Sequence, residues 1–162
     1  WRVRNRSPAL PRAAYTGLSR QVPLPDPDLH ALLYDRHMTP AAWTPYPDAA
    51  EVLRGLCERG LGIGVISNIG WDPRPVFEAH GLDRFIDAYV LSYRHGIQKP
   101  DPRLFAIACA ALEVDPRVPL MFGDSREADG GAAALGCRVH FVDHLPVAQR
   151  PDALRPVLGL VD

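Results

Sequence analysis

Lysine is nearly absent from this sequence. Among 18 basic residues in 162, Lys99 is the only lysine, and the other seventeen are arginines. Arginine offers a rigid planar fork, whereas lysine is a compact point charge on a flexible stem, which suits a narrow site beside an anionic oxygen. Because the chain uses arginine wherever a positive charge is enough, Lys99 is a candidate functional residue.

A surplus of either charge is also absent. The formal net charge is −1 and the pI is about 6.6, so the chain lacks the broad basic surface that favours nucleic acid or an anionic membrane. Long apolar runs are missing as well, since none approaches the roughly 20 residues of a membrane span. We therefore expect neither nucleic acid nor a membrane as a partner.

Cysteine is scarce too. The three cysteines, Cys57, Cys109 and Cys137, are odd in number, widely spaced and set in apolar or helical surroundings. This pattern argues against a disulfide framework and against a zinc site. It favours a reducing compartment, so we expect the protein to be cytoplasmic.

Glycine is rare in the first part of the chain. The first 47 residues hold one of the thirteen glycines but eight of the seventeen prolines, with helical patches such as DLHALLYDRH between them. This composition predicts an irregular helical region with little sheet. We assign residues 1–46 to this region and residues 47–162 to the main globular unit.

Strands and helices alternate in residues 47–162. Asp48, followed by Glu51, predicts a capped helix that ends at Gly60. Apolar runs predict further elements, listed here by range: strands at 62–67, 86–92, 118–123 and 138–143, and helices at 71–82, 101–114, 126–136 and near 151–160. The alternation predicts an α/β fold with a mostly parallel, Rossmann-like sheet and helices on both faces.

Polar residues follow the predicted strands where such sheets bind ligands, beyond the carboxyl ends. Ser67 and Asn68 come after the first strand, Lys99 shortly after the second, and Asp124 after the third. Each has an ordinary alternative: Ser67 and Asn68 suit a turn, Asp124 suits a helix cap, and Asp129 suits the first turns of a helix. Their joint position favours a common site.

Three stretches resemble a known family. VISN, QKPDP and GDSREADGGAAALG are similar, in order and spacing, to the second, third and fourth motifs of the haloacid dehalogenase-like hydrolase superfamily, in its capped phosphatase branch. By this resemblance, residues 1–46 are a partial helical cap and residues 47–162 the core. The resemblance implies a Mg²⁺-dependent phosphomonoester hydrolase that acts through an aspartyl-phosphate on a small phosphorylated metabolite.

The resemblance also implies a role for each candidate. Ser67 would donate a hydrogen bond to a phosphoryl oxygen, and Asn68 would help to hold the site. Lys99 would pair with the nucleophilic carboxylate and the phosphoryl group. Asp124 would bind Mg²⁺, and Asp129 would hold one of its waters or orient the first acid.

The family's first motif, an apolar strand ending in Asp-x-Asp with the nucleophile, has no counterpart here. The only Asp-x-Asp is Asp26 and Asp28, and the prolines before it disfavour a central strand. In the family that strand lies at the centre of the sheet, between the strands that end at Ser67 and Asp124. We therefore expect a fragment of a longer phosphatase that is inactive by itself. The unpaired backbone groups facing the gap should weaken the fold, close up into a different pairing or take up a strand from elsewhere.

Two other functions stay open. A 2-haloacid dehalogenase shares the fold and the nucleophile but uses no Mg²⁺, which would leave Asp124 and Asp129 without a task. A non-catalytic protein could keep the fold for binding alone. Asp72 and Arg74 are possible neighbours of the site, although Asp72 also suits the cap of the following helix.

Overall fold

The computed structural model describes residues 10–143 and 145–161. Its α-helices and strands, in chain order, are α1 (Leu10–Ser19), α2 (Leu29–His37), α3 (Ala49–Glu58), β1 (Gly64–Ser67), α4 (Arg74–Ala79), β2 (Ala88–Leu91), α5 (Ser92–His95), α6 (Pro102–Ala111), β3 (Leu120–Gly123), α7 (Arg126–Asp129) and β4 (Arg138–Phe141). The short 3-10 helices are η2 (Pro40–Ala42), η3 (Asp83–Phe85), η4 (Gly130–Leu135), η5 (Val147–Gln149) and η6 (Arg155–Gly159). No helix of the described ranges is long and apolar enough to cross a membrane.

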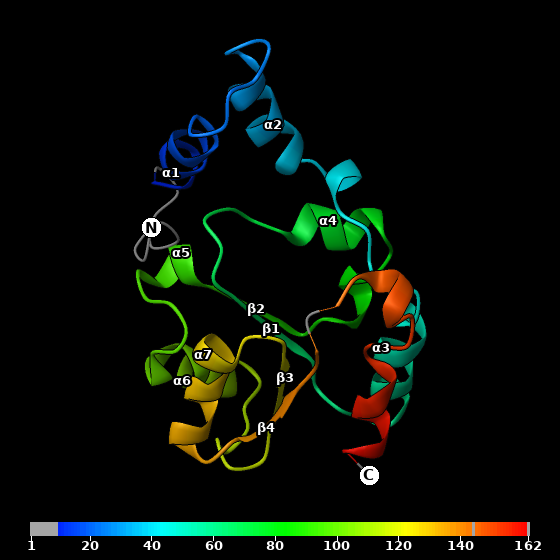
Figure 1. Cartoon of the computed structure of the whole chain (residues 1–162). Coiled ribbons are helices and arrows are strands. Elements are labelled where there is room, and N and C mark those ends of the chain that lie inside the picture. The colour runs from blue at the N-terminus through cyan, green and yellow to red at the C-terminus, as the bar shows by residue number, and fades with distance from the viewer. Residues whose placement is uncertain (1–9, 144, 162) are drawn as a thin grey trace.

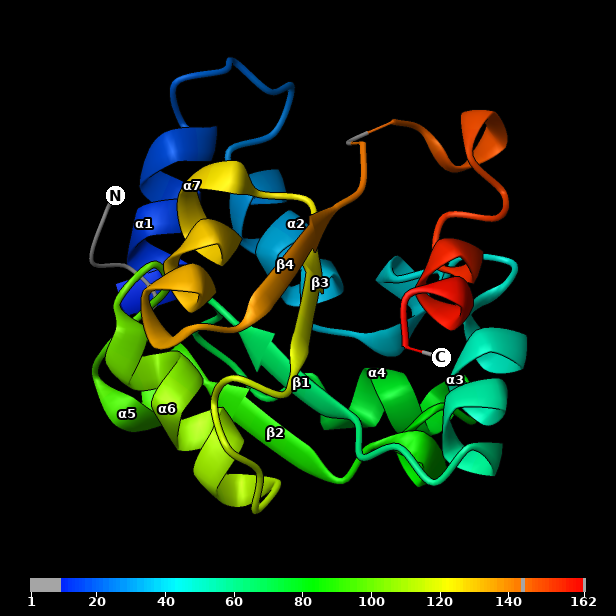
Figure 2. The same cartoon turned by 90° about the horizontal axis from the view of Figure 1, so that it is seen from below.

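The strands form two separate sheets of two strands each. β1 pairs in parallel with β2, from Gly64 opposite Ala88 onward, and β3 pairs in parallel with β4, from Leu120 opposite Arg138 onward. The predicted parallel α/β arrangement is confirmed. Figure 2 shows the two pairs, β1 beside β2 and β3 beside β4. Within the described ranges no ladder joins β1 to β3, so the sheet is interrupted between these two strands, where the gap was expected.

Helices cover both faces of the half-sheets because alternate strand residues point to opposite faces. On one face, Leu120 and Phe122 of β3 pack against the buried Val52 and Leu56 of α3 and Val157 of η6. On the other face, the apolar residues that pack together come from α6, β1, β3 and the segment around η4, and they are Phe105, Cys109, Ile66, Met121, Ala132 and Cys137. The two cores meet at the strands.

The helices α1 and α2 lie side by side, above the carboxyl ends of the strands (Figure 1). Arg12 of α1 forms an ion pair with Asp35 of α2 at 2.6 Å, and the ring centroids of Tyr15 and Tyr34 are 5.5 Å apart. Trp43, which follows η2, lies 5.7 Å from Trp71 between ring centroids. This ring contact joins the α1–α2 side of the molecule to the loop that follows β1.

Local structure differs from expectation in three places. The helix predicted at 126–136 is α-helical only to Asp129, and η4 continues it as a 3-10 helix. A Cβ at Gly131 would overlap the carbonyl oxygen of Pro100, so this segment passes directly against the chain after Lys99. The C-terminal helix is likewise the short 3-10 helix η6, and α5 forms where no helix was predicted.

The predicted cap role of Asp48 is wrong in one respect. Asp48 precedes α3, but its side chain makes no capping hydrogen bond to that helix. Instead Oδ2 accepts hydrogen bonds from the backbone N–H groups of Leu154 and Arg155, each at 2.8 Å. Asp48 is buried, and it anchors the C-terminal segment to the start of α3.

Candidate active site

Asn68 ties the end of β1 to Lys99. The backbone N–H of Lys99 donates to Asn68 Oδ1 at 2.7 Å, and Asn68 Nδ2 donates to the Lys99 carbonyl at 2.9 Å. A side-chain amide can make this closed pair because it carries both a donor and an acceptor. The peptide bond from Lys99 to Pro100 is cis. Asn68 therefore positions the main chain of Lys99.

The ammonium group of Lys99 reaches Asp129. Lys99 Nζ donates to Asp129 Oδ1 at 2.6 Å, and the backbone N–H of Ser125 donates to Asp129 Oδ2 at 2.9 Å. A Cβ at Gly123 would overlap the Asp129 carboxylate, so β3 has to end in glycine. These contacts bring the turns after β1 and β3 to one place, as the strand order predicts.

Asp124 is exposed at the end of β3. The hydroxyl of Ser125 accepts a hydrogen bond from the backbone N–H of Ala128 at 3.1 Å, so Ser125 is the cap of α7. Ser125, and not Asp124, therefore caps this helix, so the alternative reading of Asp124 as a helix cap is wrong. Asp124 lines the same cavity as Lys99 and Asp129.

Ser92 holds the loop after Asn68, and the sequence reading missed it. Ser92 is fully buried, its hydroxyl donates to the carbonyl of Ile69 at 3.0 Å, and the same oxygen accepts from the N–H of Ile69 at 3.0 Å. Ser67, the last residue of β1, lies two residues before Ile69. The sequence feature that could have identified Ser92 is its position as a small polar residue at the end of an apolar strand.

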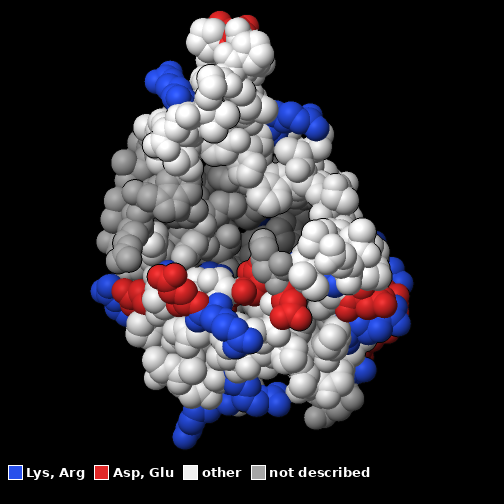
Figure 3. Space-filling view, viewed as in Figure 1, with Lys and Arg blue, Asp and Glu red and all other residues white. Residues whose placement is uncertain are grey.

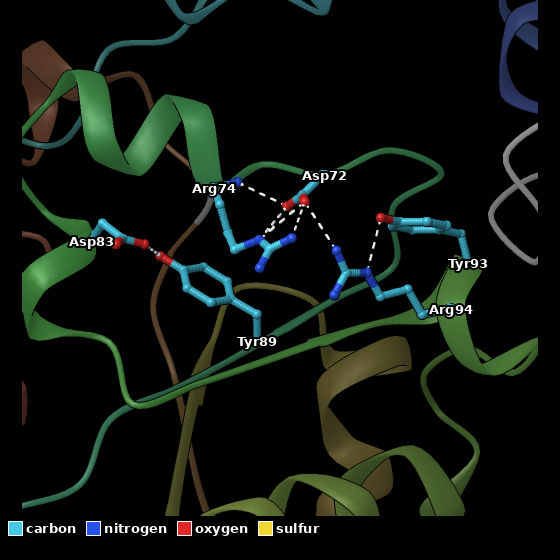
Figure 4. Close-up of polar contacts among 6 residues, drawn as sticks. All are labelled: Asp72, Arg74, Asp83, Tyr89, Tyr93 and Arg94. Carbon is cyan, nitrogen blue, oxygen red and sulfur yellow. Dashed lines mark hydrogen bonds and ion pairs between the residues drawn. The ribbon is translucent and has the colours of Figure 1, made fainter.

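Asp72 lies between two guanidinium groups (Figure 4). Arg74 donates to both carboxylate oxygens, and Arg94 of α5 donates to Oδ2 at 3.0 Å. Hydrogen bonds from Arg74, with the charge of Arg94 as a smaller cause, lower the pKa of Asp72. Asp72 also accepts from the backbone N–H of Arg74 at 3.1 Å, so it fixes the start of α4.

A cavity of about 1090 Å³ runs between the half-sheets. Lys99, Asp124 and Asp129 lie along it, and apolar side chains from both helical layers form most of the remaining wall. Figure 3 shows the molecule hollowed between the α1–α2 helices and the core, with acidic side chains along the core side of the hollow. The charged end of the cavity is the candidate active site.

Asp26 and Asp28 lie elsewhere. Both are exposed in the segment between α1 and α2, where Asp26 Oδ1 accepts from the backbone N–H of Asp28 at 2.9 Å. Figure 1 shows this segment at the far end of the helical region from the strands. This Asp-x-Asp therefore serves a turn and lies away from the candidate site.

Comparison with known proteins identifies the family. The sequence profile for haloacid dehalogenase-like hydrolases matches residues 18–136. The chain belongs to this family of hydrolases. Its three recognisable motifs, around Ser67, Lys99 and Asp124, all lie within the match.

The relatives of this chain carry names with different activities. The chain is 36% identical over 105 residues to haloacid dehalogenase-like hydrolase domain-containing protein 3 of Bos taurus, covering 64% of this chain and 42% of that protein. It is 34% identical over 110 residues to phosphoserine phosphatase of Thermus thermophilus, covering 67% and 44%. A dehalogenase crystal structure with an intermediate complex superimposes with a TM-score of 0.79 at 25% identity, covering 95% of this chain and 72% of that one. The chain thus spans less than half the length of these two curated relatives.

Proposed function

We propose that this hydrolase chain carries the phosphate-binding and metal-binding part of a Mg²⁺-dependent phosphomonoesterase that acts through an aspartyl-phosphate. The observation that carries the proposal is the largely buried ion pair of Lys99 and Asp129, which lines the same cavity as the exposed Asp124. Phosphoryl transfer requires mainly positioning and neutralisation of charge, and a fixed ammonium next to a hard oxygen ligand supplies both. The proposed substrate is a small phosphorylated metabolite, in keeping with the phosphoserine phosphatase relative.

Each residue has a proposed task in this reaction. Ser67, at the end of β1, donates a hydrogen bond to a phosphoryl oxygen. The ammonium group of Lys99 reduces the repulsion between the phosphoryl group and an attacking carboxylate. Asn68 acts through Lys99, because its amide is bonded to the main chain of that residue on both sides.

The donor set supports Mg²⁺. Mg²⁺ in phosphoryl-transfer sites is bound by one or two carboxylates together with the substrate phosphate. Asp124 would hold the ion, while Asp129 already accepts hydrogen bonds at both oxygens and stays a positioning residue. The described part of the chain has no group of three or more metal-binding side chains. When bound, Mg²⁺ supplies the charge that neutralises the phosphoryl oxygens.

The proposed reaction needs an attacking carboxylate, and none of the residues assigned to the site supplies it. The only Asp-x-Asp of the sequence lies in the segment between α1 and α2, at the far end of the helical region from the strands (Figure 1). We therefore propose that the 162-residue chain binds metal and phosphate but does not turn over phosphate esters by itself. Hydrolysis by the pure chain that requires Asp124 would contradict this part of the proposal.

A 2-haloacid dehalogenase is the second candidate, because a solved dehalogenase superimposes on almost the whole chain. That chemistry needs no divalent cation. It would leave Asp124, at the mouth of the site, without a ligand to bind. Metal binding at Asp124 therefore separates the two candidates.

The test measures binding of Mn²⁺, a paramagnetic substitute for Mg²⁺, by electron paramagnetic resonance with and without inorganic phosphate. Asp124→Asn should weaken Mn²⁺ binding by roughly tenfold or more, which corresponds to about 1.4 kcal/mol. The matched control is Asp152→Asn, an exposed acid in the C-terminal segment, which should leave the affinity unchanged. Phosphate should tighten Mn²⁺ binding in the wild type and in Asp152→Asn but not in Lys99→Met. Equal Mn²⁺ affinity in the wild type and Asp124→Asn would reject the metal site.

A further inference from the structure

Two arginines share one carboxylate beyond the ends of β1 and β2. Asp72, in the loop after β1, accepts hydrogen bonds from Arg74 at the start of α4 and from Arg94 of α5. Figure 4 shows Asp72 between the two guanidinium groups, so the cluster bridges α4 and α5. Hydrogen bonds from Arg74 lower the pKa of Asp72, so its carboxylate is ionised at neutral pH. Two positive charges and one negative charge leave the cluster with a net charge of +1.

Asp72 occupies only part of each guanidinium group. Arg74 bonds to it through Nε and Nη2, whereas Arg94 bonds to it through Nη2 and to the hydroxyl of Tyr93 through Nε. In the part of the chain that the structure describes, neither Nη1 group forms a hydrogen bond. The side chains of Arg74 and Arg94 are 43% and 39% exposed. Both arginines can therefore still donate to an anion that arrives from solution.

A short, ordered loop connects this cluster to the candidate active site. Ser92, the first residue of α5, exchanges two hydrogen bonds with Ile69, and Ile69 directly follows Asn68. Asn68 in turn is bonded to the main chain of Lys99. Because Arg94 lies five residues before Lys99, their Cα atoms are at most about 18 Å apart. One small molecule can therefore reach both groups.

The charge of the cluster indicates which anion it accepts. A guanidinium group binds carboxylate or phosphate through parallel N–H bonds. The net charge of +1 matches a carboxylate, whereas a phosphate monoester carries about −1.5 to −2 at neutral pH. Among the six residues of Figure 4, the other acid, Asp83, is bonded only to the hydroxyl of Tyr89, at 2.9 Å. The positive charge of the two arginines is therefore balanced by Asp72 alone within this group.

We propose that Arg74 and Arg94, held in place by Asp72, form a second anion site that binds a carboxylate group of the substrate. The inference rests on the proposed function and narrows its substrate to phosphorylated carboxylic acids. Lys99 and Asp124, with Mg²⁺, receive the phosphoryl group, and the two guanidinium groups receive the carboxylate at the other end of the molecule. Arg74 and Arg94 thus select the substrate and take no part in the chemical step.

The probes are phosphonates, which lack the ester bond of a phosphomonoester. Phosphonoacetate and its next two homologues, longer by one and two methylene groups, carry a carboxylate at increasing distance from phosphorus. Each is paired with the alkylphosphonate that has a methyl group in place of the carboxylate. Isothermal titration calorimetry in Mg²⁺ buffer measures the affinity of the chain for both members of each pair. For at least one length, the carboxylate member should bind roughly tenfold more tightly, which corresponds to about 1.4 kcal/mol.

Arg94→Gln tests the site because Arg94 is partly exposed and does not fix the start of α4, as Asp72 and Arg74 do. This substitution should abolish the preference for the carboxylate member. The matched control is Arg117→Gln, which removes an exposed arginine paired with Asp115 before β3 and should keep the preference. A measurement without any substitution uses NMR of the wild type. The Nε–H signal of Arg94 should shift with the carboxylate member and not with the alkylphosphonate.

The possible results separate this inference from the proposed function. Equal affinities within all three pairs would overturn the inference and leave the proposed phosphate site standing. A preference that persists in Arg94→Gln, or an unchanged Nε–H signal of Arg94, would overturn it as well, by placing the carboxylate elsewhere on the chain. If neither member of any pair binds, the proposed phosphate site is itself rejected, and the inference that rests on it is rejected too.

Discussion

Lys99 Nζ lies 2.6 Å from Asp129 Oδ1, and only 12% and 3% of the two side chains are exposed. The lysine that stands out in the sequence thus forms a largely buried ion pair that connects the two half-sheets. If one partner of a buried ion pair is removed, the remaining charge is buried without compensation and destabilises the fold. This pair therefore joins the stability of the fold to the charge of the site.

Asp129→Asn should destabilise the protein strongly, because it leaves the ammonium of Lys99 buried without a counter-charge. Removal of one partner of a buried pair typically costs about 3–5 kcal/mol. The free energy of unfolding from urea titration measures the effect. The matched control is Glu51→Gln, which breaks the exposed pair with Arg155 and should change stability by less than about 1 kcal/mol. Equal effects of the two substitutions would show that the Lys99–Asp129 pair is not buried in solution.

Gly131→Ala should destabilise the fold, since the new methyl group would overlap the carbonyl oxygen of Pro100. Overpacking of this kind costs about 1–3 kcal/mol. Gly17→Ala is the matched control, because Gly17 lies inside α1 with open space around its Cβ position. It should stabilise the protein by about 0.5–1 kcal/mol. Thermal unfolding should show a lower melting temperature for Gly131→Ala and a higher one for Gly17→Ala. A change in the same direction in both variants would contradict the close approach at Gly131.

The alternating elements could be predicted from sequence because local chemistry decides them. Asp101 followed by Pro102 is a sequence typical of a helix start, and the Asp101 side chain accepts a hydrogen bond from the backbone N–H of Arg103 at 3.0 Å. The short apolar runs became β1 to β4 for the same reason. The expected gap between the strands ending at Ser67 and Gly123 followed from the family resemblance, since no local pattern in either strand indicates which neighbour is missing.

Long-range contacts could not be predicted in the same way. Asp48 has the sequence context of a helix cap, yet its carboxylate binds backbone groups more than one hundred residues away. Only the folded chain brings η6 to that position. The bonds between Asn68 and Lys99 are similar, because strand order predicted that the two residues would be near one another but not that one positions the other.

The unfolding free energy of Asp72→Asn should depend less on pH, in the acid range, than that of the wild type. The pKa of Asp72 in the folded protein is lowered, first by hydrogen bonds from Arg74 and then by the charge of Arg94. A lowered pKa adds stability that is complete above the unfolded value, about 3.9, and is lost as the pH falls through the folded value. The difference in unfolding free energy between the wild type and Asp72→Asn should be constant from about pH 5 to 7 and shrink below about pH 4. Urea titrations across this range measure it, and a difference that stays constant down to pH 3 would contradict the assigned ion pairs.

Ser92→Ala should loosen the loop that carries Ser67 and Asn68. The substitution keeps the size of the core but removes the hydroxyl that bonds both backbone groups of Ile69, 3.0 Å away in each case. Because Ser92 is fully buried, water cannot replace the hydroxyl, and the unmet groups should cost about 1–3 kcal/mol. Ser92→Thr, which keeps the hydroxyl, separates the lost bonds from a change in packing. If the loop positions the phosphate site, Ser92→Ala should also weaken the effect of phosphate on Mn²⁺ binding while leaving Mn²⁺ binding alone unchanged. A loss of stability with an unchanged phosphate effect would restrict Ser92 to the fold.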